Sequence, residues 1–122
     1  MLRWDSPVQL DGRQALEDAD TAGLDVLKGG GVTTLLGAAN RDPSQFSDPD
    51  AFDIGRQQGP PISFGSGIHY CLGANLAKAE GQEIFAGLVR RFKGIEQAGE
   101  LRQRGRLTLK GYETVPITVL PR

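Results

Sequence analysis

The segment FGSGIHYCLG, residues 64–73, decides how this chain is interpreted. It holds the only cysteine of the chain, Cys71, and its only histidine, His69. Glycines stand at positions 65, 67 and 73 around them. Because glycine adopts positive φ at little cost, the segment predicts a loop that bends tightly around both side chains. The question is which chemistry needs a lone thiol and a lone imidazole two residues apart.

The sequence that follows this loop is the strongest helix signal in the chain. Residues 72–92, LGANLAKAEGQEIFAGLVRRF, are dominated by good helix formers, and Gly94 is predicted to end the helix. Apolar residues lie on most of its faces, which is typical of a helix buried between other layers. Cys71 stands at the predicted start of the helix, where the partial positive charge of the helix end favours a thiolate over a thiol.

Composition narrows the class of protein. The chain has 122 residues, 39% of them hydrophobic, and a net charge of −1. This balance gives no field that would attract nucleic acid, and no apolar run is long enough for a membrane span. A single cysteine forms no internal disulfide, and the N-terminus lacks the pattern of a signal peptide. We therefore expect no nucleic-acid or membrane partner, and a cytoplasmic location.

Several interpretations of Cys71 compete on the residues alone. An inert buried cysteine in a tight turn is the simplest one. A zinc site needs three or four ligands, more than one cysteine and one histidine supply. A Cys–His nucleophile pair needs His69 within hydrogen-bond reach of the sulfur. Covalent attachment of c-type haem needs a second cysteine. A single thiolate as axial ligand of a haem iron fits the residues present.

The spacing Phe-x-x-Gly-x-His-x-Cys-x-Gly in this segment resembles the haem-binding signature of the cytochrome P450 family. The resemblance extends along the chain. Residues 2–13, LRWDSPVQLDGR, are similar to the segment that follows the K-helix of the family. Residues 35–56, LLGAANRDPSQFSDPDAFDIGR, are similar to the strand and meander of bacterial members. The helix of residues 72–92 resembles the L-helix behind the haem.

This resemblance implies roles for individual residues. Cys71 would be the proximal ligand of the iron of haem b, and Phe64 would pack near the thiolate. His69 and Arg13 would pair with the haem propionates. The predicted cofactor-binding set is Cys71, His69, Arg13, Phe64, Gly65, Gly67 and Gly73. Arg3 would match the arginine of the Glu-x-x-Arg motif, and Arg41 and Arg56 lie in the stretch that supplies supporting arginines.

The resemblance also implies the fold class. We expect an α+β chain, the C-terminal part of the mainly helical P450 fold, with residues 1–122 as one haem-binding fragment of a single domain. Its parts would be short strands, the meander loop, the cysteine loop, a buried L-helix and a C-terminal β-hairpin. The sequence itself predicts a hairpin turn at Asp11–Gly12, two strands around residues 21–23 and a buried strand within residues 31–40. It also predicts an irregular loop over residues 40–61, which Phe46, Phe52 and Ile54 would anchor. One or two hairpins are expected over residues 101–120.

By resemblance, the complete enzyme is a monooxygenase that inserts one oxygen atom from O2 into a small organic substrate, with electrons from a ferredoxin-type donor. The glutamate of Glu-x-x-Arg would fall one position before Met1, and the oxygen-activating helix would lie further upstream. We therefore expect the DNA before Met1 to encode both, and expect the 122 residues alone not to turn over. The alternative is a truncated or vestigial haem-binding protein without monooxygenase activity.

Overall fold

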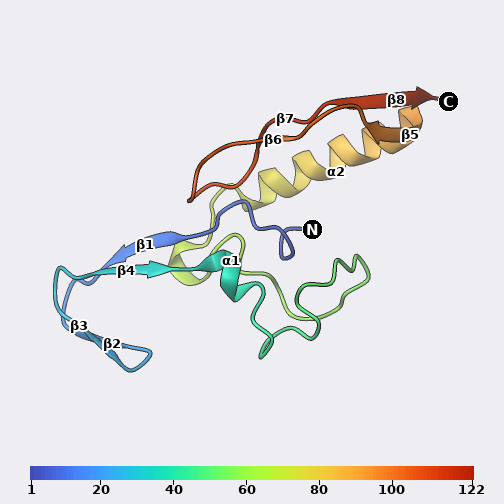
Figure 1. Ribbon diagram of the computed structural model, residues 1–122. Helices are drawn as coiled ribbons and strands as arrows, with labels where there is room; N and C mark the ends of the chain where they lie inside the picture. Colours follow the sequence, from blue (N-terminus) through green and yellow to red (C-terminus); the bar gives the residue numbers. More distant parts are fainter. The chain divides into compact units, whose positions relative to one another are not determined.

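A computed structural model describes all residues, 1–122, and the chain divides into two compact units (Figure 1). The first unit comprises Met1–Ser63 together with Arg106–Lys110. The second unit comprises Phe64–Gly105 together with Gly111–Arg122. Each unit is described by itself.

The strands of the first unit form two antiparallel pairs. Strand β1 (Asp11–Gln14) pairs with β4 (Gly31–Thr34), and β2 (Ala19–Thr21) pairs with β3 (Leu24–Val26). The turn between β2 and β3 is made by Ala22 and Gly23, with φ values of 54° and 79°. Positive φ at both central residues matches the twist of a two-residue hairpin. The two strands predicted around residues 21–23 are thus confirmed.

One other prediction for the first unit is wrong, and a second is confirmed only in part. Asp11 and Gly12 open β1 instead of forming a turn, and Gly12 does not take the positive φ that such a hairpin turn requires. The strand predicted within residues 31–40 ends at Thr34 and is mostly exposed. The short helix α1 (Leu36–Ala39) follows it, because leucine and alanine at these positions favour the helical conformation.

Residues 40–63 contain no helix or strand, as the cluster of Asp, Pro and Ser predicts. Only one of the three predicted apolar anchors is buried. Phe46 is 7% exposed, whereas Phe52 and Ile54 are 54% and 86% exposed. The core of the first unit is small, with Leu36 beside Phe46 as its buried apolar residues. Polar contacts therefore carry much of its cohesion.

Residues 106–110 join the first unit by pairing with its N-terminal segment. Leu109 forms an antiparallel bridge with Val8, and the amide of Lys110 donates to the carbonyl of Pro7 at 2.8 Å. The ammonium of Lys110 also pairs with the Asp5 carboxylate at 2.6 Å. These contacts join two segments of the first unit that lie 105 positions apart in the sequence at Asp5 and Lys110.

The second unit is built on the helix that the sequence predicts. Helix α2 covers Ala74–Arg91 and follows the short 3-10 helix η1 (Gly67–His69). Ala74 is the only buried residue of α2. Large apolar side chains such as Leu76 and Val89 are 64% and 66% exposed. The helix is confirmed, but its predicted burial is not reached within these residues.

The end of α2 differs from the sequence prediction. The helix stops at Arg91, and Phe92 takes an extended conformation that starts β5 (Phe92–Gln97). Gly94 therefore lies inside a strand and is not a helix stop. A Cβ at Gly94 would lie 3.1 Å from Cδ1 of Leu120, so the partner strand approaches closely at this point.

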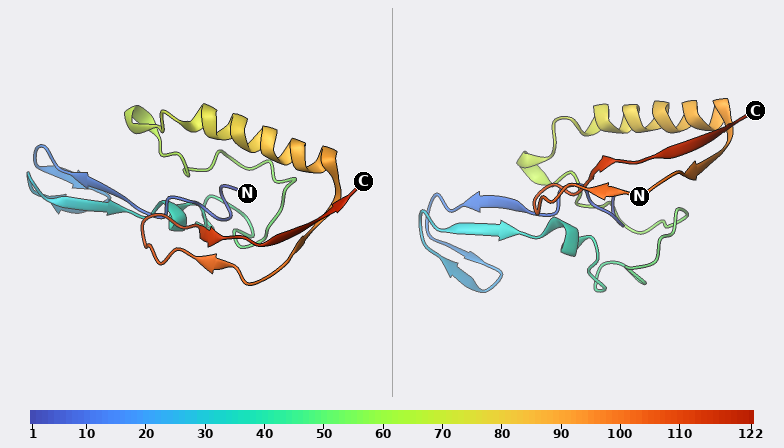
Figure 2. Two further views of the ribbon diagram at one scale, coloured as in Figure 1. Left: turned by 90° about the horizontal axis from the view of Figure 1, so that it is seen from above. Right: turned by 45° about the horizontal axis from the view of Figure 1, so that its top comes forward.

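The C-terminal segment forms the expected β-structure, with one pairing that was not predicted. Strand β6 (Arg102–Gln103) pairs with β7 (Tyr112–Thr114), and β8 (Ile117–Pro121) returns to pair with β5. Figure 2 shows β8 ending beside the C-terminal end of α2. There the Arg122 guanidinium donates to the carbonyl of Val89 at 2.9 Å.

Candidate functional site

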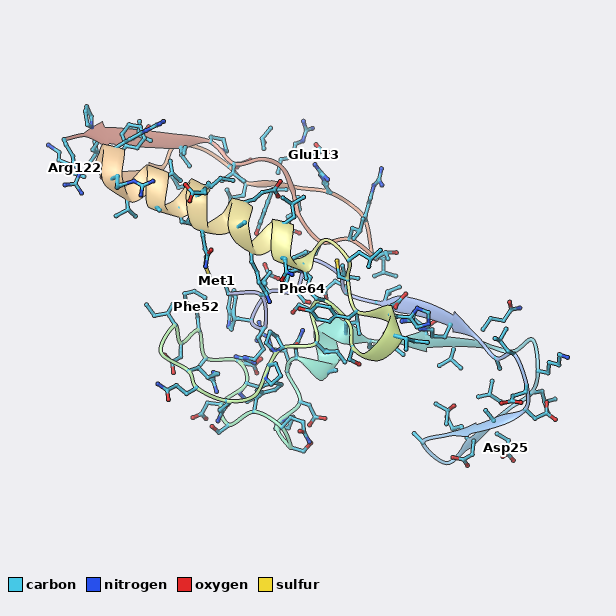
Figure 3. The ribbon with its side chains drawn as sticks, turned by 180° about the vertical axis from the view of Figure 1, so that it is seen from behind. Met1, Asp25, Phe52, Phe64, Glu113 and Arg122 are labelled. Carbon is cyan, nitrogen blue, oxygen red and sulfur yellow. The ribbon has the colours of Figure 1, made fainter.

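The cysteine loop, residues 64–73, lies at the start of α2. Gly65 and Gly67 have φ values of 72° and 63°, in the left-handed region that other residues rarely adopt. The two turns bring the amide of Cys71 back to the carbonyl of Phe64, to which it donates at 2.9 Å. Figure 3 labels Phe64 where this loop begins. The glycines that define the motif thus perform the chain reversal that the sequence predicts.

The thiol of Cys71 is free and exposed. Its carbonyl accepts a hydrogen bond of 3.2 Å from the amide of Ala74, the first residue of α2. Cys71 therefore stands just before the first residue of the 18-residue helix α2, at the N-terminal end of that helix. A Cβ added to Gly73 would lie 3.8 Å from this sulfur, so the glycine leaves one side of it open. The exposure is incompatible with an inert buried cysteine.

The cysteine loop also carries apolar and aromatic side chains. The rings of Phe64 and Tyr70 meet edge to face with centroids 6.3 Å apart, and the Lys78 ammonium lies 5.9 Å from the Phe64 centroid. Ile68 and Leu72 are almost fully exposed, at 98% and 104% of their reference areas. Exposed aliphatic side chains close to Cys71 in the sequence offer an apolar surface to a ligand.

The structure brings six of the seven predicted cofactor-binding residues into one loop: Phe64, Gly65, Gly67, His69, Cys71 and Gly73. His69 ends η1 and is exposed. Arg13, the seventh, belongs to β1 of the first unit. There it pairs with the Asp11 carboxylate and donates to the carbonyl of Gly12 at 2.9 Å. Its pairing with a propionate stays a prediction.

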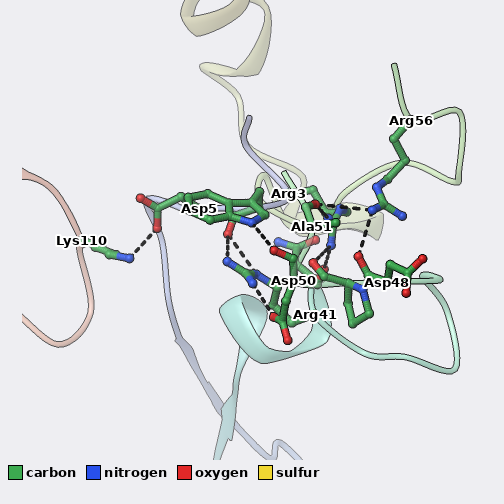
Figure 4. A network of polar contacts seen from close by, with 11 residues as sticks. Arg3, Asp5, Arg41, Asp48, Asp50, Ala51, Arg56 and Lys110 are labelled. Atoms are coloured by element: carbon green, nitrogen blue, oxygen red, sulfur yellow. Dashed lines mark hydrogen bonds and ion pairs between the residues drawn. The ribbon is translucent and has the colours of Figure 1, made fainter. Parts of the chain in front are cut away.

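Three arginines of the first unit form the network that Figure 4 shows. Arg3 donates to the carbonyls of Asn40 and Pro49 at 2.7 and 2.9 Å, and its guanidinium lies 5.0 Å from the Phe46 ring centroid. Burial lowers the pKa of Arg3, and the nearby charges of Arg56 and Arg41 add to this effect. Arg3 is therefore a structural cation enclosed by carbonyl oxygens and not a solvated surface charge.

The other two arginines of the network, Arg41 and Arg56, also bond to backbone carbonyls of the first unit. Arg41 donates to the carbonyl of Trp4 at 2.6 Å, stacks over its ring at 4.8 Å and pairs with Asp50. Arg56 donates to the carbonyl of Asp48 at 2.9 Å, while its Nε is buried without a partner. An open cavity of about 490 Å³ lies here within the first unit. Its lining includes Met1, Arg3, Trp4, Phe52 and Arg56.

Sequence reasoning missed the most buried polar group of the chain. Asn40 has no exposed surface, and its amide contacts Ser6 and Ser63, which are 2% and 4% exposed. One signal for it exists: Asn40 directly follows the apolar stretch of residues 35–39, where a polar side chain is normally buried only when it is hydrogen-bonded.

The chain has no group of three His, Cys, Asp or Glu side chains placed to hold a metal ion. None of its helices has the length and apolar character needed to cross a bilayer.

Comparison with known proteins agrees with the signature in the cysteine loop. The family model described as cytochrome P450 matches residues 1–106. The chain belongs to the cytochrome P450 family. Membership implies haem as the cofactor, and the predicted α+β fold of the C-terminal part of a P450 is confirmed.

The similarity covers nearly all of the chain but only part of its relatives. It is 42% identical over 120 residues to cytochrome P450 CYP199A2 of Rhodopseudomonas palustris, covering 98% of this chain and 29% of that protein. It is 44% identical over 118 residues to the biotin biosynthesis cytochrome P450 of Bacillus subtilis, covering 96% of this chain and 30% of that protein. The chain thus spans less than a third of the length of these P450s.

Solved P450 structures share the fold. Substrate-free CYP109E1 of Bacillus megaterium matches with a TM-score of 0.93 at 34% identity, over 99% of this chain and 32% of that one. P450BioI in complex with an acyl carrier protein that carries hexadec-9Z-enoic acid matches with a TM-score of 0.90 at 44% identity, over 97% of this chain and 31% of that one.

The residues of the cysteine loop fit a haem group. A haem needs an axial ligand and an apolar surface, and the loop offers the exposed Cys71 thiol together with the exposed aliphatic side chains of Ile68 and Leu72. A Cβ at Gly67 would meet no atom within 4 Å, so the loop is open at this glycine.

Proposed function

We propose that this chain supplies the thiolate side of a cytochrome P450 monooxygenase, with Cys71 as the ligand of the iron of haem b. The observation that carries the proposal is an exposed, free thiol held by a two-glycine loop at the start of α2. When bound, the haem supplies the activation of O2 through which one oxygen atom enters an organic substrate.

Each group of the loop has a part in this proposal. The start of α2 stabilises the negative charge on the Cys71 sulfur. The bend at Gly65 and Gly67, closed by the bond from the Cys71 amide to Phe64, fixes the direction in which the sulfur leaves the loop. With haem bound, Phe64 would pack near the thiolate and shield it from water, and a drier environment would strengthen its electrostatic effect on the iron.

The charged residues are assigned to the haem edge. His69 and Arg13 would each donate a hydrogen bond to one propionate carboxylate. The Arg13 guanidinium already forms an ion pair with the Asp11 carboxylate, so a propionate would have to compete with Asp11 for it. We therefore expect His69 to contribute more to haem retention than Arg13 does.

The partners proposed for the complete enzyme follow from the same assignment. A ferredoxin-type protein would deliver electrons, and the substrate would be a small organic molecule. P450BioI is described in complex with a fatty acyl chain on an acyl carrier protein, which shows the kind of carrier-bound substrate that one similar P450 accepts.

The test is the absorption spectrum of the haem-loaded, reduced protein under carbon monoxide. A thiolate opposite CO shifts the main band far to the red, and the Cys71→Ser variant should lose this band completely. Ser66→Ala, a change in the same loop that leaves the sulfur in place, is the matched control and should retain it. A parent spectrum typical of a nitrogen ligand that persists in Cys71→Ser would overturn the proposal.

A further inference from the structure

The amide of Asn40 is buried and fully used. Its Nδ2 donates to the Ser63 hydroxyl at 2.9 Å and to the Ser6 hydroxyl at 3.3 Å. Its Oδ1 accepts the backbone N–H of Ile62 at 2.9 Å. A side-chain amide offers two donors and one acceptor oxygen, so both kinds of group are satisfied. Because no part of Asn40 is exposed, water cannot replace these bonds.

Two of the three bonds hold adjacent residues. Ile62 is held by its amide and Ser63 by its hydroxyl. The Ser63 hydroxyl has a single hydrogen, which it donates to the carbonyl of Leu2 at 2.7 Å, so it accepts the bond from Asn40. The backbone at Ile62–Ser63 is thus tied both to the end of α1 and to the N-terminal segment.

This anchored pair directly precedes the cysteine loop. Phe64 follows Ser63, and the Phe64 carbonyl accepts the amide of Cys71 at 2.9 Å. One peptide unit therefore separates the residue that Asn40 holds from the residue whose carbonyl holds Cys71. A loop bends reproducibly only if its ends are fixed, and the other end of this loop is fixed by α2.

We propose that Asn40 is a positioning residue for Cys71: by holding Ile62 and Ser63, it fixes the base of the loop that presents the thiolate. The part of this inference that concerns iron rests on the proposed function. The anchoring is a property of the chain before haem binds. Asn40 does not touch the sulfur and is not a catalytic residue.

The first test measures amide exchange in the haem-free protein. Asn40→Ala removes all three bonds, and Ser63→Ala is a milder change that keeps Asn40 and removes the bond nearest the loop. Ser6→Ala is the matched control, because it removes a bond to the same Nδ2 that does not lead to the loop. The exchange rate of the Cys71 amide is compared with that of Ala77, whose amide bonds to Gly73 inside α2.

We expect the ratio of the Cys71 rate to the Ala77 rate to rise roughly fivefold to tenfold in Asn40→Ala and Ser63→Ala, and to stay at the parent value in Ser6→Ala. Loss of overall stability alone would raise both rates together and leave the ratio unchanged. An unchanged ratio in both loop-directed variants would overturn the proposal, even if both variants unfold at lower temperature.

The second test uses the haem-loaded protein and the carbon monoxide spectrum. Asn40→Ala and Ser63→Ala should retain haem about tenfold less tightly, with a larger fraction lacking the red-shifted thiolate band, as is typical when a supporting residue of a metal ligand is lost. If the parent itself lacks the thiolate band, the proposed function fails and the exchange ratio still decides the anchoring. If the parent has the band and the two variants match Ser6→Ala, the positioning proposal fails alone.

Discussion

The two units of this chain stabilise themselves in opposite ways. In the first unit, Asn40 is completely buried with its polar groups bonded, and Arg3 is enclosed by carbonyl oxygens and an aromatic ring. In the second unit, α2 runs for 18 residues with only Ala74 buried. Many of its large apolar side chains, among them Phe85 at 54% exposure, stay exposed.

This contrast indicates which parts of the geometry the chain determines by itself. A buried polar group accepts only partners in the correct direction, so the network around Asn40 and Arg3 specifies one arrangement. Burial of an exposed apolar face is favourable but not directional, so the face does not specify one arrangement of its partner. The network around Asn40 and Arg3 thus determines the geometry of the segment that leads to the cysteine loop, whereas α2 buries only Ala74 among these residues.

The largest effect is expected from Arg3→Ala. The substitution leaves the carbonyls of Asn40 and Pro49 without their donor in a part-buried place, and should lower the free energy of unfolding by about 2–3 kcal/mol. Urea unfolding followed by circular dichroism measures it. The matched change Arg90→Ala removes a guanidinium that is 70% exposed on α2 and should cost less than about 1 kcal/mol. Equal costs for the two variants would contradict the contrast between the units.

The next effect concerns the cysteine loop, at the start of the second unit. Gly67 has a φ of 63° and open space around its Cβ position, so Gly67→Ala tests backbone strain without a clash. It should cost about 1–2 kcal/mol of stability in the loop and weaken haem retention accordingly. Gly105→Ala, where φ is not positive and the space is also open, should change neither quantity. Unaltered haem retention in Gly67→Ala would show that the loop can reach the haem by another path.

The cysteine loop and α2 were predictable because both are encoded locally. The fixed spacing around Cys71 specified a loop with glycine turns, and the helix formers of residues 72–92 specified the helix to within two residues of its start. The turn at Ala22–Gly23 was local in the same sense. Positions of this kind depend on neighbours within a few residues, which one sequence displays.

The features that escaped prediction depend on partners far along the chain. Strand β5 contains Lys, Glu and Gln that would equally suit a helix, and only its pairing with β8, for example Ile95 with Val119, makes it a strand. The role of Asn40 arises from contacts with residues 34 and 23 positions away. No local pattern indicates which serines such an amide will meet.

A substitution in α2 is expected to have a smaller effect and to raise the free energy of unfolding instead of lowering it. Gly87 lies inside the helix with open space at its Cβ position, so Gly87→Ala should stabilise this chain by about 1 kcal/mol through helix propensity. If other P450 segments cover α2, the same substitution in a full-length enzyme should lose that gain, because the added methyl group would meet a packed neighbour. Thermal unfolding of both forms measures the difference. An equal gain in both would show that this face of α2 stays uncovered.

The smallest effect is electrostatic and belongs to the first unit. Hydrogen bonds from the side chain and the backbone amide of Ser44 lower the pKa of Asp42 below its ordinary value of 3.8. The pKa of the Asp42 carboxyl group is lower in the folded state than in the unfolded chain. The stability that the Asp42 carboxylate contributes is therefore present above pH 3.8 and is lost as the pH falls through the lowered pKa.

Ser44→Ala removes the hydroxyl but keeps the backbone bond of 2.8 Å, so the pKa of Asp42 should rise only part of the way back. A carbon NMR titration of the Asp42 carboxyl group measures this, with Ser66→Ala in the cysteine loop as the control that leaves the pKa in place. A pKa that stays fixed in Ser44→Ala would show that the backbone amide alone orders this turn.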